Sequence, residues 1–333
     1  MYSAYIAKFE NLQSELKKSL DFIDWKKQVK KDSTVFVKPN FTFPYYKKGI
    51  TSSPNLIQTL LETLKDRADR VILGESDGGN HSFSADTAFK GHRMNEICKQ
   101  TGVELVNLSL QPSRFIEDLI QKRRVKVQLP HLLLDEVDCV VSVPVLKAHV
   151  MTQVSLGMKN LWGCYPDTMR GLYHKKLSYK LALITKLLKP KIILIDGSFA
   201  LTEHGPLYGK VLKNNVIISS NNPVVSDSLG AEVMGISPTK CKHITVAEQA
   251  GLGIMDLSQV KINEDWREYI IKFSINKTFI DMLATIPFNS EIFAKLIMDS
   301  PATPIINKIA PLLKTTKERE VAIDILQGKR NNK

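Results

Sequence analysis

The residues best suited to chemistry are concentrated in residues 144–163, which carry Lys147, His149, Lys159 and Asn160. Histidine titrates near ~6.5 and suits proton transfer at neutral pH. A lysine desolvated beside other cations has a lowered pKa and can act as a base or as a nucleophile towards carbonyl groups. The segment therefore predicts a site that binds an anionic substrate and transfers protons between its own side chains and that substrate.

The position of this segment in the chain supports that interpretation. It follows an apolar, β-branched run at 137–143, which predicts a buried strand. In open α/β sheets, ligands bind beyond the carboxyl ends of the strands. Lys147 and His149 share one side of an extended chain because they are two residues apart. We expect catalytic roles for this pair and for two residues further along the chain, Lys159 and His174.

Polar residues at other predicted element ends could bind the substrate. A short strand at 34–37 ends in a Lys-Pro-Asn motif, and proline stops the strand pairing there. The segment 49–54 predicts a helix start, whose free amides could hold an anion. Glycines in the loop 202–209 permit close approach of the backbone. The predicted substrate-binding residues are Lys38, Asn40, Thr51, Asn160 and Gly205.

Four carboxylates also fall at predicted strand ends or in the loops that follow. They are Glu75, Asp77, Asp196 and Asp227. Carboxylates suit a hard cation such as magnesium, and imidazoles suit a transition metal. If the strands are parallel, these groups share one edge of the sheet, and together they predict a divalent metal site. In the alternative interpretation, Asp196 and Asp227 cap helices or loops.

The elements that position these residues alternate along the chain. Strands at 34–37, 70–73 and 103–108 are separated by helices at 54–69 and 85–100, and a further strand is expected at 191–195. Such alternation predicts an α/β fold with a mostly parallel or mixed sheet and helices on both faces. Residues 33–259 would form this domain.

The two ends of the chain differ from this domain. Residues 1–32 carry apolar positions at helical spacing and predict an N-terminal helical segment. Residues 260–333 are basic, contain four prolines and predict a helical C-terminal extension. This extension could dock on an acidic membrane surface or on a protein partner.

The composition narrows the classes of partner. A formal net charge of +12 favours anionic partners, although surplus lysines can also serve solubility alone. The basic cluster at 122–126 has the alternation of an edge strand whose charges block unwanted pairing, so nucleic acid is not expected as a partner. The oligomeric state does not follow from the sequence.

The cysteines and the apolar runs indicate the compartment. The four cysteines are far apart and match neither a disulfide framework nor a metal motif. Cys164 lies beside the predicted site, where a packed thiol is the alternative to a nucleophile. No signal peptide and no membrane-spanning run is visible, so a cytoplasmic location is expected.

Two other histidines are not expected in the site. His131 and His243 have the pattern of helix-start or surface residues.

Several short motifs recur in order along the chain. They are Lys38-Pro-Asn40, Thr51 with Pro54, Gly74-Glu75, Val143-Pro-Val-Leu-Lys-Ala-His149, Lys159-Asn-Leu-Trp-Gly163, His174, Asp196-Gly197, Gly205-Pro206 and the helix start near Asp227. On these motifs the chain resembles, over roughly residues 33–253, the bacterial and archaeal family labelled domain of unknown function 362.

The resemblance implies little about chemistry. Many members look like carriers of a ferredoxin-type module with clustered cysteines, and this chain departs from that pattern, so an iron–sulfur cluster is not expected. The residues themselves predict an enzyme that acts on a small anionic substrate, with or without a divalent metal. The alternative is a redox-accessory protein that binds a metal or an anion without turnover.

Overall fold

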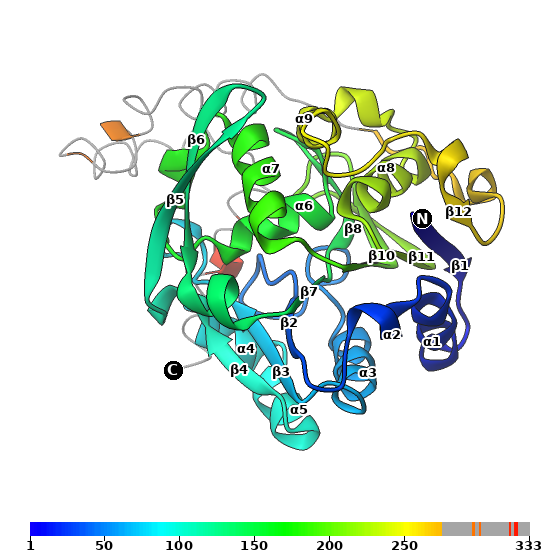
Figure 1. Ribbon diagram of the computed structural model, residues 1–333, viewed down its shortest axis with the longest axis horizontal. Helices are drawn as coiled ribbons and strands as arrows, with labels where there is room; N and C mark the ends of the chain where they lie inside the picture. The colour runs from blue at the N-terminus through cyan, green and yellow to red at the C-terminus, as the bar shows by residue number, and fades with distance from the viewer. Residues whose placement is uncertain (275–294, 297–299, 301–319, 321–322, 326–333) are drawn as a thin grey trace.

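The computed structural model describes residues 1–274, 295–296, 300, 320 and 323–325. Its centre is a ten-stranded mixed sheet, in which eight strands run in the order β12-β1-β11-β10-β7-β2-β3-β4 (Figure 1). The strands β8 and β9 continue from β10 off this path. Helices cover both faces of the sheet, so the predicted α/β fold class is confirmed.

The bounds of the elements are as follows. The strands of the main sheet are β1 (Ser3–Lys8), β2 (Thr34–Lys38), β3 (Arg70–Glu75), β4 (Glu104–Asn107), β7 (Cys139–Ser142), β8 (Val145–His149), β9 (Gln153–Ser155), β10 (Ile192–Thr202), β11 (Lys210–Ser220) and β12 (Lys261–Ile262). The helices are α1 (Leu12–Phe22), α2 (Trp25–Gln28), α3 (Pro54–Lys65), α4 (Ala85–Gly91), α5 (Met94–Thr101), α6 (Gly157–Asn160), α7 (Leu177–Leu188), α8 (Pro223–Val233) and α9 (Lys242–Gln249).

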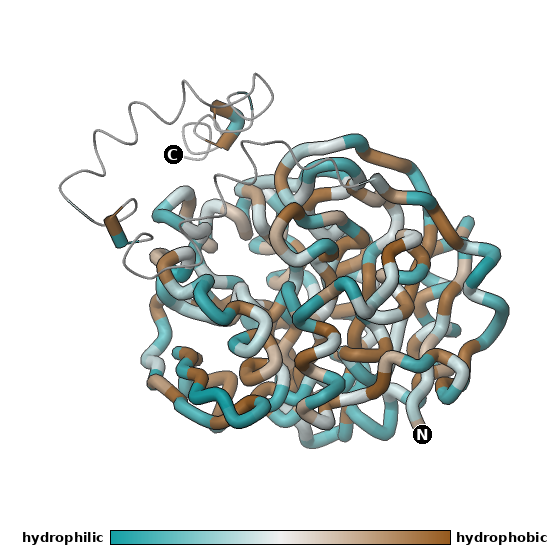
Figure 2. The backbone as a smooth tube through the Cα atoms, turned by 90° about the horizontal axis from the view of Figure 1, so that it is seen from above, coloured by the Kyte–Doolittle hydropathy of each residue, from teal (hydrophilic) through white to brown (hydrophobic). Residues whose placement is uncertain are grey.

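The sheet is buried on both faces because its strands are apolar at successive positions. In β2, Val35 and Val37 pack in the core that contains α1, α3 and α5, whereas Phe36 packs in the core that contains α7, α8 and α9. This alternation follows from the two-residue period of a strand. Strands that are apolar on both sides are typical of parallel sheets covered by helices. Hydrophobic and hydrophilic stretches alternate along the chain throughout the molecule (Figure 2).

The parallel half of the sheet brings several strand ends to one edge. The strands β2, β3, β4 and β7 are mutually parallel, and β10 is parallel to β7 and β8. The carboxyl ends of β2 and β3 therefore lie side by side, as the alternation of elements predicted.

The N-terminal segment differs from its prediction. Residues 3–8 form β1, which pairs antiparallel with β11, and only then do α1 and α2 follow. The expectation of an entirely helical segment at 1–32 is therefore wrong at its start. The alternating burial of Ala4 and Ile6 on one face, and Tyr5 and Ala7 on the other, is the strand pattern. The helical spacing of the apolar residues in α1 dominated the pattern of residues 1–32, and the strand pattern of residues 3–8 is only six residues long.

The C-terminal extension is described only in part. Residues 261–262 form β12, which pairs parallel with β1, and residues 266–269 form a short 3-10 helix. Most of the predicted helical extension at 260–333, and with it the predicted membrane or protein contact, lies outside the described residues. No helix in the described part of the chain is both long and apolar enough to cross a membrane.

The basic segment near residue 125 lies in a hairpin apart from the main sheet. The hairpin pairs β5 (Ser113–Ile120) with β6 (Arg123–Pro130) in antiparallel register. Val125 and Val127 are buried beneath it, whereas Arg124 and Lys126 are exposed. The alternation was therefore read correctly, but the strand pairs with its own neighbour and does not form an edge of the main sheet.

Two strands extend further than their sequence patterns indicated. The strand β10 continues past Asp196 through a bulge to Thr202, so Asp196 lies inside the strand and not at its end. Residues 145–149 form β8, which pairs with β10 and β9. Lys147 and His149 therefore belong to a strand and not to the loop beyond one, a correction that fixes which way each side chain points.

Candidate functional site

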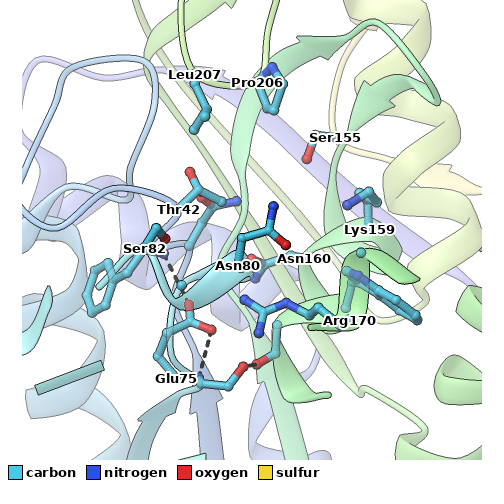
Figure 3. Close-up of a pocket in the computed structure, with 18 of the residues that line it drawn as sticks. Thr42, Glu75, Asn80, Ser82, Ser155, Lys159, Asn160, Arg170, Pro206 and Leu207 are labelled. Atoms are coloured by element: carbon cyan, nitrogen blue, oxygen red, sulfur yellow. Dashed lines mark hydrogen bonds between the residues drawn. The ribbon is translucent and has the colours of Figure 1, made fainter. Parts of the chain in front are cut away.

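A pocket of about 380 Å³ lies where β2 and β3 end (Figure 3). Its walls come from the loops that follow β2 and β3, from the ends of β8 and β9, from α6, and from the loops around residues 170–174 and 206–207. The volume lies in the range of small-molecule sites. Seven of the thirteen predicted site residues line this pocket: Lys38, Asn40, Glu75, His149, Lys159, Asn160 and His174.

Two cations face this pocket. Lys159 of α6 and Arg170 both line it, and Figure 3 places their charged ends towards its centre. Within the described residues, the Lys159 ammonium makes no hydrogen bond or ion pair, and the guanidinium of Arg170 donates one long bond, 3.4 Å, to the carbonyl oxygen of Asp167. Burial, and then the charge of Arg170, lower the pKa of Lys159 to about 8. These two donors have capacity left for an anion.

Two imidazoles line the same pocket. The Nδ1 atom of His149 accepts the backbone N–H of Met151 at 3.1 Å, so the proton of the neutral ring belongs on Nε2. His174 has the other tautomer, because its Nδ1 donates to the carbonyl of Gly171 at 2.9 Å. Burial, followed by the charge of Lys159, lowers the pKa of His149 well below its usual value and that of His174 to about 4. Both rings are therefore neutral at pH 7.

The strand-end residues Lys38 and Glu75 form a buried ion pair. The Lys38 ammonium donates to the Glu75 carboxylate at 2.5 Å and to the carbonyl of Pro39 at 2.7 Å. Glu75 also accepts the backbone N–H groups of Phe41 and Ser76. The pair lines the floor of the pocket, but its hydrogen-bonding capacity is largely used within the protein.

The short helix α6 is held against this pair by tight contacts. Asn160 donates to the carbonyl of Lys38 at 3.0 Å and to Ser142 at 3.1 Å. A Cβ atom at Gly163 would lie 2.6 Å from the Glu75 carboxylate, so only glycine allows this approach. Asn160 lines the pocket, yet both of its amide bonds are structural. It positions the turn that carries Lys159.

Lys147 lies behind the pocket wall and not on it. Its side chain is fully buried, and its ammonium donates to the side chains of Asn40 and Thr42 and to the carbonyl of Ile50, at 2.8–3.1 Å. Lys147 and His149 do share one side of β8, as predicted. The segment 40–50 covers Lys147 but not His149. Lys147 therefore fastens that segment, and Asn40, which does line the pocket, is fixed by it.

The burial of Lys147 predicts that stability rises with pH. Desolvation, then the charges of Lys159 and Lys38, lower its pKa to about 7, whereas an unfolded lysine titrates near ~10.4. Between about pH 7 and ~10 the unfolded chain binds more protons than the native one, so the free energy of unfolding increases with pH. Urea unfolding should be measured across this range for the wild type and for Lys147→Met. The free energy of unfolding of the wild type minus that of the variant should increase with pH. A pH-independent difference would contradict this expectation.

The four carboxylates predicted for a divalent metal do not come together. Glu75 is paired with Lys38, Asp77 accepts from Ala85 N–H and Asn107, and Asp196 accepts from the N–H groups of Ser53 and Ser198. Within the described residues, no three His, Cys, Asp or Glu side chains lie close enough to hold a metal ion. This corrects the prediction of one shared metal site at the sheet edge.

Asp227 caps a helix, which was the alternative to its predicted role as a metal ligand. From inside α8 its carboxylate accepts the N–H groups of Gly157 at 2.7 Å and Met158 at 3.0 Å, which are the first turn of α6. Burial raises its pKa to about 7. His243, interpreted as a helix-start or surface residue, is the second residue of α9 and is fully buried, with Nε2 3.9 Å from this carboxylate. The helical pattern of α9 did not show that its histidine faces inwards.

Two predicted substrate-binding residues act through the backbone. The hydroxyl of Thr51 bonds the backbone of Lys47 and does not reach the pocket. Gly205 packs on β8, where a Cβ would lie 1.9 Å from the carbonyl oxygen of Ala148. It thereby places its neighbours Pro206 and Leu207 on the pocket wall.

The residues that the sequence interpretation missed are polar groups in loops. Arg170, Asn80 and Ser82 were not among the predicted site residues, yet all three line the pocket (Figure 3). No strand or helix signal points to them. Cys164 is fully buried, and desolvation raises its pKa to about 12, which fits a packed thiol and not a nucleophile.

Two comparisons with individual proteins give distant similarities. A thylakoid-associated protein of Synechocystis is 24% identical over 124 residues, which are 35% of this chain and 39% of that protein. The chain thus matches well under half the length of this relative. A solved structure from Thermotoga maritima has 14% identity and a TM-score of 0.36, over 56% of this chain and 50% of that one.

A family model gives the wider match. The model described as a domain of unknown function matches residues 35–232, more than half of the chain. The matched range contains every pocket residue named above, from Lys38 to Leu207. The chain therefore belongs to the domain of unknown function family DUF362.

Proposed function

We propose that the protein is an enzyme whose pocket binds a small anionic substrate between Lys159 and Arg170. The observation that carries this proposal is the Lys159 ammonium, which lines the pocket without a hydrogen bond or ion pair among the described residues. A desolvated charge without a partner is unfavourable, and an anion in the pocket would compensate it. The guanidinium of Arg170 can hold a carboxylate or phosphate through two bonds.

The same groups support proton transfer. With a pKa of about 8, a fraction of Lys159 is uncharged at neutral pH and can accept a proton from the substrate, while Arg170 keeps the anion in place. The Nε2–H group of His149 can donate to a substrate oxygen on which negative charge develops. Lys147 and Lys38, which were expected to contribute directly, are committed to the protein itself.

Analysis of small molecules released from the denatured protein tests the binding proposal. Mass spectrometry should find a carboxylate or phosphate compound in the wild type and much less of it in Lys159→Met. Titration with acetate and inorganic phosphate at low salt gives a second readout, because electrostatic binding weakens as salt is added. A wild-type protein that releases no anion and binds neither probe would exclude the proposed function.

The role of His149 is tested by a pair of variants. His149→Asn retains an acceptor near Nδ1 for the Met151 N–H but loses the Nε2 donor, whereas His149→Gln places an amide donor near the position of Nε2. With the released compound as substrate, we expect about a hundredfold loss of turnover in His149→Asn. We expect partial recovery in His149→Gln, with melting temperatures close to that of the wild type. Equal activity of the two variants would contradict a donor role.

A further inference from the structure

The pocket has a second, apolar surface that a small anion alone would not use. Phe83, Pro206 and Leu207 line it together with Ile325. In Figure 3, Pro206 and Leu207 lie at the end of the pocket opposite Arg170 and Glu75. Phe83 is 5% exposed, so only a small part of its side chain is accessible at the pocket. The pocket therefore has a cationic end and an apolar end.

Ile325 comes from far along the chain and is held in place by specific contacts. Its neighbour Asp324 forms an ion pair with Lys47 at 2.7 Å, across 277 residues of sequence. The Tyr45 hydroxyl also bonds Asp324; burial, and then this bond, raise the pKa of Tyr45 to about 12. The Lys47 ammonium in turn lies 4.5 Å from the centre of the Phe43 ring. The Lys47 ammonium and the Tyr45 hydroxyl thus hold Asp324 in place, and the Phe43 ring lies against that ammonium.

The side chain of Ile325 continues the apolar surface on which Leu207 lies. Both pack against the buried cluster of Phe43, Ile50 and Leu201. Ile325 remains only partly buried, and its remaining surface lines the pocket. A ligand group that covered this surface would remove apolar area of both partners from water.

We infer that the ligand is an anion that carries an apolar group, and that Asp324 and Ile325 complete the subsite for that group. The inference rests on the proposed function, because Lys159 and Arg170 hold the anionic end. It adds the substrate class and a specificity role for Asp324 and Ile325. A carboxylate and a phosphate satisfy the cationic end equally, so both belong in the test.

Calorimetric titration of the full chain with two matched pairs of probes tests the inference. The pairs are acetate with benzoate, and inorganic phosphate with phenyl phosphate. Within each pair, we expect the phenyl compound to bind about tenfold more tightly, because its ring buries apolar area at Leu207 and Ile325. Lys47→Glu should cancel most of this advantage and leave acetate and phosphate binding within about twofold. The double variant Lys47→Glu/Asp324→Lys should restore it, because the ion pair is reversed.

Ile325→Ala gives a second reading that does not depend on the ion pair, and it should reduce the phenyl advantage in the same way. Equal affinities within each pair, or an equal loss for all four probes in Lys47→Glu, would overturn the inference and leave the proposed function intact. A double variant that behaves like Lys47→Glu would overturn the part assigned to Asp324. If none of the four probes binds the wild type, the proposed function fails as well.

Discussion

Replacing Lys159 with methionine is expected to weaken the binding of benzoate and phenyl phosphate by about thirtyfold or more. Removing one partner of a desolvated charge pair costs more than 2 kcal/mol in typical interfaces, which corresponds to about this factor. Arg170 remains in the variant, so binding should be reduced and not abolished. Turnover should be lost completely, because the same substitution removes the group proposed to accept the proton.

The stability of this variant separates a binding role from a structural one. The lowered pKa of Lys159 means that its charge is unfavourable in the folded protein, so the methionine variant should melt no lower than the wild type. Lys175→Met is the matched control, because it removes the same charge from an exposed position outside the pocket. The control should bind within about twofold of the wild type. Binding unchanged in Lys159→Met would exclude the ammonium as the anion site.

Gly205→Ala is expected to destabilise the protein by about 2–4 kcal/mol, since it combines overpacking with backbone strain. Its Cβ would lie 1.9 Å from the carbonyl oxygen of Ala148, an atom of β8 that cannot move independently of the sheet. Its φ of +33° is also one that side chains rarely adopt. The loop must then move away from β8 and take Pro206 and Leu207 from the pocket.

Two measurements check this expectation. Urea unfolding gives the stability loss, and titration with the phenyl compounds should show that their advantage over acetate and phosphate is reduced. Gly79→Ala is the control, because a Cβ there meets no atom within 4 Å and its backbone angle is ordinary. The control should change stability by no more than about 0.5 kcal/mol. If the two variants were equally stable, Gly205 would not be needed for close packing.

The expectation that Lys38 and Glu75 both lie at strand ends had a sound reason. Both follow short apolar strands, and in parallel strands such ends share one edge of the sheet. The same reasoning failed for Asp196, because β10 continues through a bulge beyond the point where its apolar run stops. The length of a strand depends on the neighbouring strands with which it can pair, here β8 and β11. The local sequence pattern does not reveal those neighbours.

The alternation along β8 shows a second limit of sequence reasoning. It correctly placed Lys147 and His149 on one side of the strand, but the two have different surroundings. Lys147 is covered by residues 40–50, which satisfy its ammonium, whereas His149 reaches the pocket. Which position is covered depends on a segment about 100 residues earlier, and no periodicity records such a contact.

By itself, then, the sequence determined the α/β class and the edge of the sheet at which the pocket lined by Lys38, His149 and Lys159 is found. Those features follow from local periodicity and from the shared direction of parallel strands. Only the tertiary structure decided that Lys159 and Arg170 face the open pocket, that Lys147 and Asp227 are used internally, and that Asp324 and Ile325 reach the same place. The physical reason is that whether a polar group is satisfied depends on contacts between distant segments, which a single sequence does not contain.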